Sequence, residues 1–209
     1  MNRRILTLAA ALLAAIAIGS VAVGGAAAGR SDLTSLRAAT ARFNDIGQAG
    51  PGGYGQPPAP APLHECISSF NNTGAMGFHY INGGLLDDKI EATRPEVLVY
   101  APDSTGKRKL VAVEYVVFQD AWKRVHGDTM PELFGQMFMA TGSPNRFDIP
   151  AFYSLHVWLW QDNPAGLFAP FNPTVSCDGQ RAAAIPAKLT TAAVDRAKQF
   201  ACAIRSGAA

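Results

Sequence analysis

The stretch KLVAVEYVVF, residues 109 to 118, is a run of β-branched and aromatic residues with a single acidic residue inside it. Such a run predicts a buried β-strand. Successive side chains of a strand point to opposite faces. One face is therefore uniformly apolar, with Val111, Val113, Tyr115 and Val117. The other face carries Leu110, Ala112, Glu114 and Val116. A carboxylate on this second face needs a partner, because an unpaired buried charge costs several kcal/mol.

Three further stretches are typical of strands of the same sheet. They are AMGFHYI at 75–81, EVLVYAP at 96–102 and YSLHVWLW at 153–160. The segment DSTGKR, which joins 96–102 to 109–118, is rich in turn residues. It predicts that these two strands form a hairpin.

Helical patterns flank the strands. Apolar residues recur at steps of three and four over 31–49, and 186–209 reads as an amphipathic helix. The stretch PELFGQMFM, residues 131–139, is expected to form one or two helical turns, with proline at the first position. This arrangement predicts an α+β fold, with an antiparallel sheet of at least four strands and helices packed on one face.

The N-terminus predicts export. Residues 1–28 combine Arg3 and Arg4 with an apolar run and a small-residue cleavage pattern that ends at Ala28, which is typical of a signal peptide. We therefore expect a periplasmic or extracellular protein. Residues 29–62, a helix followed by a Gly/Pro-rich segment, and residues 63–209, an α+β region with a C-terminal helix, are expected to form a single domain.

The charge balance argues against some partners. The chain has 18 basic and 16 acidic residues, and loss of Arg3 and Arg4 with the signal peptide leaves 16 of each. A nearly neutral protein gives no reason to expect nucleic acid as a partner, or a membrane surface after cleavage. The sequence identifies no protein partner.

Three cysteines remain to be placed. Cys66 opens the region of predicted strands and Cys177 closes it, so we expect these two to form a disulfide, which export permits. The loop between them exceeds a hundred residues, for which the chain-entropy relation gives about 4–5 kcal/mol of stabilisation. Cys202 is either a small buried residue or half of a different pair.

One polar residue on each of three predicted strands suggests a site. His79 shares a face with Gly77 and Ile81, and His156 shares a face with Ser154 and two tryptophans. If these faces and that of Glu114 lie on the same side of one sheet, His79, Glu114 and His156 converge. Small neighbours leave space around them, and Trp158 and Trp160 are expected to form the wall of a pocket.

Two interpretations of this cluster stay open. Two histidines and a carboxylate are the ligands of catalytic zinc sites and of non-haem iron, so a divalent transition metal (Zn, Fe or Cu) is a possible cofactor. The spacings of 35 and 42 residues do not form a local metal motif. Alternatively, the histidines simply hydrogen-bond Glu114 inside the fold. His64, near Cys66, and His126, in a polar stretch, are weaker candidates.

Several segments resemble a family of exported, signal-peptide-bearing bacterial proteins. They are ATARFNDIGQAGPGGYG, GAMGFHYIN, PEVLVYAP, LVAVEYVVF and LHVWLWQDNPAGLFAPFNPTVSC, within about residues 38–177. The resemblance implies an exported single domain. It implies no activity, substrate or catalytic residue.

The leading functional hypothesis is an exported protein that binds a small ligand or metal ion in a cavity on the sheet, with His79, Glu114 and His156 as its polar contacts. A second hypothesis is a non-catalytic structural or interaction protein of the cell envelope. A third is a hydrolase or oxidoreductase that works through a metal or through acid–base chemistry at Glu114 and a histidine.

Overall fold

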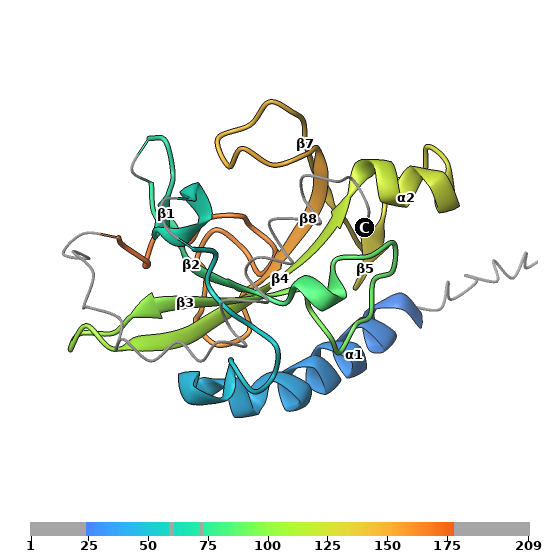
Figure 1. The fold of residues 1–209 in the computed structure, drawn as a ribbon. Helices are drawn as coiled ribbons and strands as arrows, with labels where there is room; N and C mark the ends of the chain where they lie inside the picture. The colour runs from blue at the N-terminus through green and yellow to red at the C-terminus, as the bar shows by residue number, and fades with distance from the viewer. Residues whose placement is uncertain (1–23, 59–60, 72, 178–209) are drawn as a thin grey trace, which may run out of the picture.

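The structure, a computed structural model, describes residues 24–58, 61–71 and 73–177. Its centre is a curled antiparallel sheet of six strands in the order β1-β2-β3-β4-β8-β7 (Figure 1). These strands span Ile67–Ser68 (β1), Ala75–Ile81 (β2), Val97–Pro102 (β3), Arg108–Phe118 (β4), Met139–Thr141 (β7) and Phe152–Val157 (β8). The helices span Gly24–Thr40 (α1) and Gln119–His126 (α2), with single 3-10 turns at Ala41–Asn44, Ile46–Gln48, Pro62–His64 and Gly83–Leu85. The expected sheet of at least four antiparallel strands is confirmed.

The four predicted stretches all form strands, and one of them, β8, ends earlier than predicted. β2, β3 and β4 follow the predicted stretches closely, and β3 and β4 form the expected hairpin. β8 ends at Val157 instead of reaching residue 160. It ends there because the chain turns away: the Trp158 amide donates to the Leu167 carbonyl, 2.9 Å away, instead of to a neighbouring strand.

The helical turns expected in PELFGQMFM are wrong. This segment forms a two-stranded hairpin, Glu132–Leu133 (β5) with Gln136–Met137 (β6). Its two loop residues, Phe134 and Gly135, both have positive φ angles, 57° and 73°. Two successive positive φ angles are characteristic of tight hairpin turns and incompatible with a right-handed helix. The sequence analysis also missed α2, which follows β4 directly.

The N-terminal segment covers one face of the sheet. Leu36 of α1 is fully buried and packs with Phe43 and Tyr54 against strand residues that include Tyr100 and Tyr115. The Tyr100 hydroxyl donates to the Phe43 carbonyl at 2.7 Å. The tyrosine faces of the strands therefore hold the segment from α1 to residue 54 in place. Figure 1 shows α1 along the lower side of the sheet.

The prediction that the helices pack on one face of the sheet is not confirmed, because Leu36 of α1 and Ala121 of α2 belong to different core clusters. Ala121 of α2 packs in the core cluster of the opposite face, with Val116 and Phe152. The predicted C-terminal helix at 186–209 lies outside the described residues, as do residues 1–23 of the predicted signal peptide and Cys202. None of the helices among the described residues is long and apolar enough to cross a membrane.

The predicted disulfide is present. Cys66 and Cys177 are bonded, with Cα atoms 5.6 Å apart and a sequence separation of 111 residues. The bond joins the segment just before β1 to the end of the described chain. It therefore closes nearly the whole sheet into one covalent loop, which restricts the unfolded chain.

A β-bulge in β4 changes the predicted faces of its first residues. Val99 pairs with Ala112, but the next residue, Tyr100, pairs with Leu110, so Val111 is an extra residue. Leu110 consequently packs with Tyr100 on the α1 face, and Val111 packs with Ala112 on the opposite face. The expectation that Leu110 shares the face of Glu114 is therefore wrong.

A second bulge occurs where β1 meets β2. Ile67 pairs with Gly77 and Ser68 with Ala75, so Met76 is the extra residue. Gly77 has a φ of +114°, and a Cβ atom there would lie 2.5 Å from the Tyr100 carbonyl oxygen. A glycine is thus required at this position, both for the backbone conformation and for the close approach of β3.

We expect Gly77→Ala to destabilise the protein by about 3 kcal/mol or more, because it combines a strained φ angle with a backbone clash. Urea unfolding followed by tryptophan fluorescence measures the loss. Gly106→Ala is the matched control, because Gly106 also has a positive φ, +80°, but has nothing within 4 Å of its Cβ position. It should cost about 1–2 kcal/mol. Equal losses in the two variants would contradict the close-approach argument.

Candidate functional site

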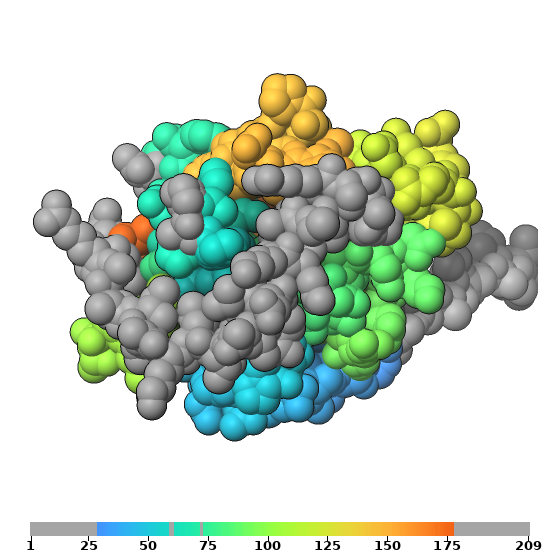
Figure 2. Space-filling view, viewed as in Figure 1, coloured from blue at the N-terminus to red at the C-terminus, as the bar shows by residue number. Residues whose placement is uncertain are grey.

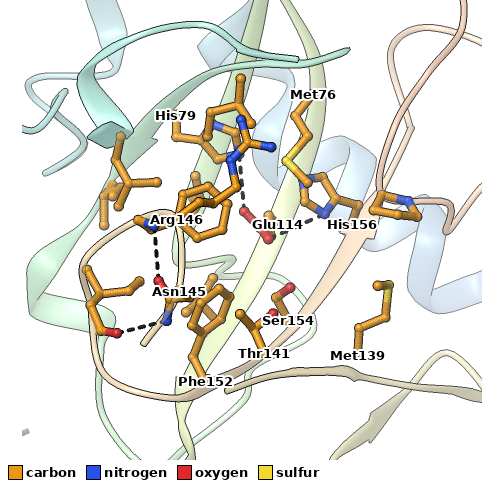
Figure 3. Close-up of a pocket in the computed structure, with 18 of the residues that line it drawn as sticks. Met76, His79, Glu114, Met139, Thr141, Asn145, Arg146, Phe152, Ser154 and His156 are labelled. Atoms are coloured by element: carbon orange, nitrogen blue, oxygen red, sulfur yellow. Dashed lines mark hydrogen bonds and ion pairs between the residues drawn. The ribbon is translucent and has the colours of Figure 1, made fainter. Parts of the chain in front are cut away.

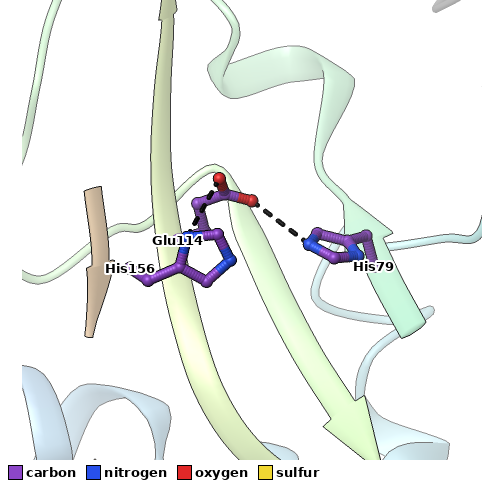
Figure 4. Close-up of side chains that lie close together, drawn as sticks. All are labelled: His79, Glu114 and His156. Atoms are coloured by element: carbon purple, nitrogen blue, oxygen red, sulfur yellow. Dashed lines mark ion pairs between the residues drawn. The ribbon is translucent and has the colours of Figure 1, made fainter. Parts of the chain in front are cut away.

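The structure brings the three predicted residues together on one side of the sheet. Glu114 on β4 is the direct cross-strand partner of His156 on β8. Its carboxylate lies between the two imidazoles, 3.3 Å from His79 Nε2 and 3.3 Å from His156 Nδ1 (Figure 4). One potential ligand atom from each residue lies within 4.8 Å of the others. We call these three residues the His–Glu–His cluster.

The cluster is buried and its charge state follows from its contacts. The three residues are only 3–6 % exposed. Burial by itself would raise the pKa of Glu114, but His156, the hydrogen bond with His79 and the Ser154 hydroxyl outweigh it, and this pKa lies below its usual range. Burial lowers the pKa of His156, against the attraction of Glu114. The ionised carboxylate therefore accepts hydrogen bonds, and the His156 imidazole is neutral at neutral pH.

Each imidazole has one nitrogen left over. Among the described residues, His79 Nδ1 and His156 Nε2 have no hydrogen-bond partner, although both atoms are buried. A neutral imidazole that donates its N–H to a carboxylate carries a lone pair on its other nitrogen. The Glu114–His156 pair thus has the arrangement in which a carboxylate orients a histidine and leaves Nε2 as a base or ligand. Unsatisfied buried polar atoms of this kind call for a partner.

The cluster forms part of the wall of a cavity of about 330 Å³ (Figure 3). Most of its lining is apolar and comes from segments far apart in the sequence. Examples are Ile67, Ile81, Val116, Phe147, Ile149 and Phe152. Among the described residues, the polar lining besides the cluster consists of Thr141, Asn145, Arg146 and Ser154. A volume in this range suits a small organic molecule.

The loop between β7 and β8 covers one side of the cavity. Asn145 holds it in shape, because its amide donates to the carbonyls of Gly142 and Ile149, each at 2.8 Å. The Arg146 guanidinium lies over the Phe70 ring, 4.3 Å from its centroid, and donates to the Ser68 carbonyl. Figure 2 shows this loop, in orange, beside the segment that contains β1.

The predicted tryptophan wall is wrong. Trp158 stacks on His156, with ring centroids 6.4 Å apart, but its indole N–H donates to the Ala169 carbonyl, and the side chain does not line the cavity. Trp160 packs against the hydrophobic core on the α1 face of the sheet, with the Arg37 guanidinium 4.3 Å from its ring. The alternation of faces that predicted the wall stops at Val157, where β8 ends.

Met76 lines the cavity, although strand alternation predicts that its side chain lies on the opposite face. Alternation from His79 places Met76 on the opposite face, but the bulge at this position turns its side chain into the cavity (Figure 3). The glycine that follows Met76 within a strand pattern is the one sequence signal that indicates such a bulge.

The other two histidines lie elsewhere. His64 Nδ1 contacts the Pro57 carbonyl at 2.7 Å, and His126 stacks on Trp122, with centroids 3.8 Å apart. Neither lines the cavity. Sequence reasoning also missed Glu96, which is 2 % exposed and accepts a hydrogen bond from the Val116 amide at 3.0 Å. Burial raises its pKa to about 8.

Comparison of the chain with protein-family models, with curated proteins and with solved structures gave no match. The chemistry of the site therefore rests on its own geometry.

Glu114→Gln should lower the free energy of unfolding at pH 7 by about 2–4 kcal/mol, because it removes a buried charge that two imidazoles hydrogen-bond. A carboxyl with a lowered folded-state pKa stabilises above its ordinary value of 4.5 and loses this effect as pH falls. The difference between variant and wild type should therefore shrink below that pH. Urea unfolding from pH 3 to 8 tests this, with Glu91→Gln, in the exposed pair with Arg94, as the control. A difference that stays constant with pH would contradict it.

Glu96→Gln should have the opposite pH dependence. Its raised pKa means that the folded protein holds a proton that the unfolded chain has lost, so wild-type stability falls between pH 4.5 and 8. The slope is about 1.4 kcal/mol per pH unit. The variant should lack this contribution and exceed the wild type in stability at pH 9. Denaturation at pH 5, 7 and 9 measures it, and parallel pH profiles would disprove the assignment.

Proposed function

We propose that this protein binds a small, mainly apolar molecule in the cavity above the His–Glu–His cluster. The observation that carries the proposal is the cavity itself, about 330 Å³ of space beside three buried, mutually paired polar side chains. A sheet face that served only stability is expected to be filled, because protein interiors pack at crystal-like density.

The polar groups of the site limit the chemistry of the ligand. The cluster presents an ionised carboxylate and the Nε2 lone pair of the neutral His156 imidazole, which are hydrogen-bond acceptors. A ligand carboxylate placed against Glu114 would meet like charge. Because the Arg146 guanidinium also lines the cavity, a cation would meet like charge there, so the ligand that fits is an uncharged molecule with an aromatic or aliphatic body and one donor group, such as a hydroxyl or an amine.

We also propose an exported location, periplasmic or extracellular, after removal of residues 1–28. The Cys66–Cys177 disulfide supports it, because structural disulfides persist in oxidising compartments. The alternative is an envelope protein in which the cluster has a purely structural role. Absence of ligand binding in the test below would favour it. An acid–base enzyme is a second candidate, and it rests on the Glu114–His156 pair alone.

N-phenyl-1-naphthylamine, a neutral aromatic amine with one N–H donor, should bind the full-length protein saturably, with a rise in its fluorescence. Thr141→Trp fills part of the cavity and should weaken this binding by about tenfold or more. Ala140→Trp is the matched control, because Ala140 neighbours Thr141 on β7, is exposed and does not line the cavity.

The outcome that would overturn the proposal is specific. Absence of saturable binding, or equal binding by the two tryptophan variants when both are folded by circular dichroism, would leave the cluster with a structural role.

A further inference from the structure

We propose that the His–Glu–His cluster, together with the thioether of Met76, binds monovalent copper at the wall of the cavity. This site would use the same cluster and the same cavity wall as the binding of an apolar molecule, but it does not depend on that binding.

The cluster has the geometry of a preformed ligand set. Ligand atoms about 2.0–2.3 Å from one ion in a tetrahedral arrangement lie about 3.4 Å from one another. The two contacts of Glu114 measure 3.3 Å, and the whole set lies within 4.8 Å, so small side-chain rotations close it around an ion. The side chains of His79 and His156 are at most 3 % exposed. The nitrogens of this set are His79 Nε2 and His156 Nδ1, which face Glu114, and a bound ion would replace their contacts with the carboxylate.

Met76 reaches the site only because β2 is irregular. The extra residue in the β1–β2 pairing places Met76 on the cavity side, three positions before His79. This bulge requires Gly77, with its positive φ and its close contact with β3. Bulges commonly re-aim a side chain next to a functional site. A thioether that alternation would have turned away is thereby added to two imidazoles.

The donor set and the net charge both favour Cu(I). Thioether ligands are soft and select Cu(I), while imidazole suits several transition metals. Among the described residues, Glu114 is the one carboxylate that lines the cavity, and the one lining guanidinium, that of Arg146, lies over the Phe70 ring; most of the other lining residues are apolar. A monovalent ion neutralises Glu114, whereas a divalent ion would leave a net positive charge in an apolar environment, at a cost in desolvation.

Competition with a chromophoric Cu(I) chelator tests the proposal. Ascorbate keeps copper reduced without a thiol, which protects the Cys66–Cys177 disulfide. All proteins carry Cys202→Ser, so that a free thiol cannot supply the affinity. We expect one Cu(I) per chain and a loss of affinity of about tenfold or more in Met76→Leu. Met137→Leu, which removes an exposed thioether outside this cavity, should bind copper as the parent does.

X-ray absorption and zinc binding provide the second readout. Copper on the parent protein should show sulfur and nitrogen scatterers, and the sulfur contribution should vanish in Met76→Leu. Zinc affinity should be nearly the same in the parent protein and in Met76→Leu, because both keep the two imidazoles and the carboxylate. Absence of competitive Cu(I) binding, or equal Cu(I) affinity in Met76→Leu and Met137→Leu, would overturn the proposal. Binding of N-phenyl-1-naphthylamine by the metal-free protein is measured separately, so failure of the copper site leaves the apolar-ligand proposal to its own test.

Discussion

The Glu114 carboxylate, buried between two imidazoles, is the constraint on which the site depends. A charge enclosed in a sheet costs several kcal/mol unless its partners are in place. Both contacts of Glu114 are 3.3 Å long, and they come from β2 and β8 on either side of the central hairpin. A one-residue slip of either strand would turn its histidine to the other face. The pairing register of the sheet and the polar cluster are therefore mutually dependent.

Two bulges adapt the regular sheet to this site. In β4 the extra residue Val111 lets Leu110 pack under α1 while Glu114 still faces the cavity. The Val111 carbonyl then accepts hydrogen bonds from the amides of Trp160 and Gln161, which fixes the chain beyond β8. In β2 the extra residue is Met76. Each bulge is a local departure from alternation that changes which side chains meet across the sheet.

The cover of the cavity comes from outside the sheet core. The β7–β8 loop is held by Asn145 and meets the β1 segment through Arg146, and the disulfide at Cys66 ties the start of β1 to the far end of the domain. The disulfide restrains the β1 side of the cavity, and hydrogen bonds hold the loop that covers it. The cavity is therefore largely preformed. Preformed sites lose less conformational entropy when a ligand binds.

The sequence by itself determined four of the strand stretches, the hairpin of β3 with β4, the pairing of Cys66 with Cys177, and the condition under which His79, Glu114 and His156 converge, namely that their strand faces lie on the same side of one sheet. These features follow from local residue patterns and from strand alternation. Only the tertiary structure decided the roles of Met76, Leu110 and Trp160, the hairpin at 132–137 and the burial of Glu96. Bulges, strand ends and turn conformations depend on which backbone groups find partners across the fold, and that information is not contained in any single stretch of the chain.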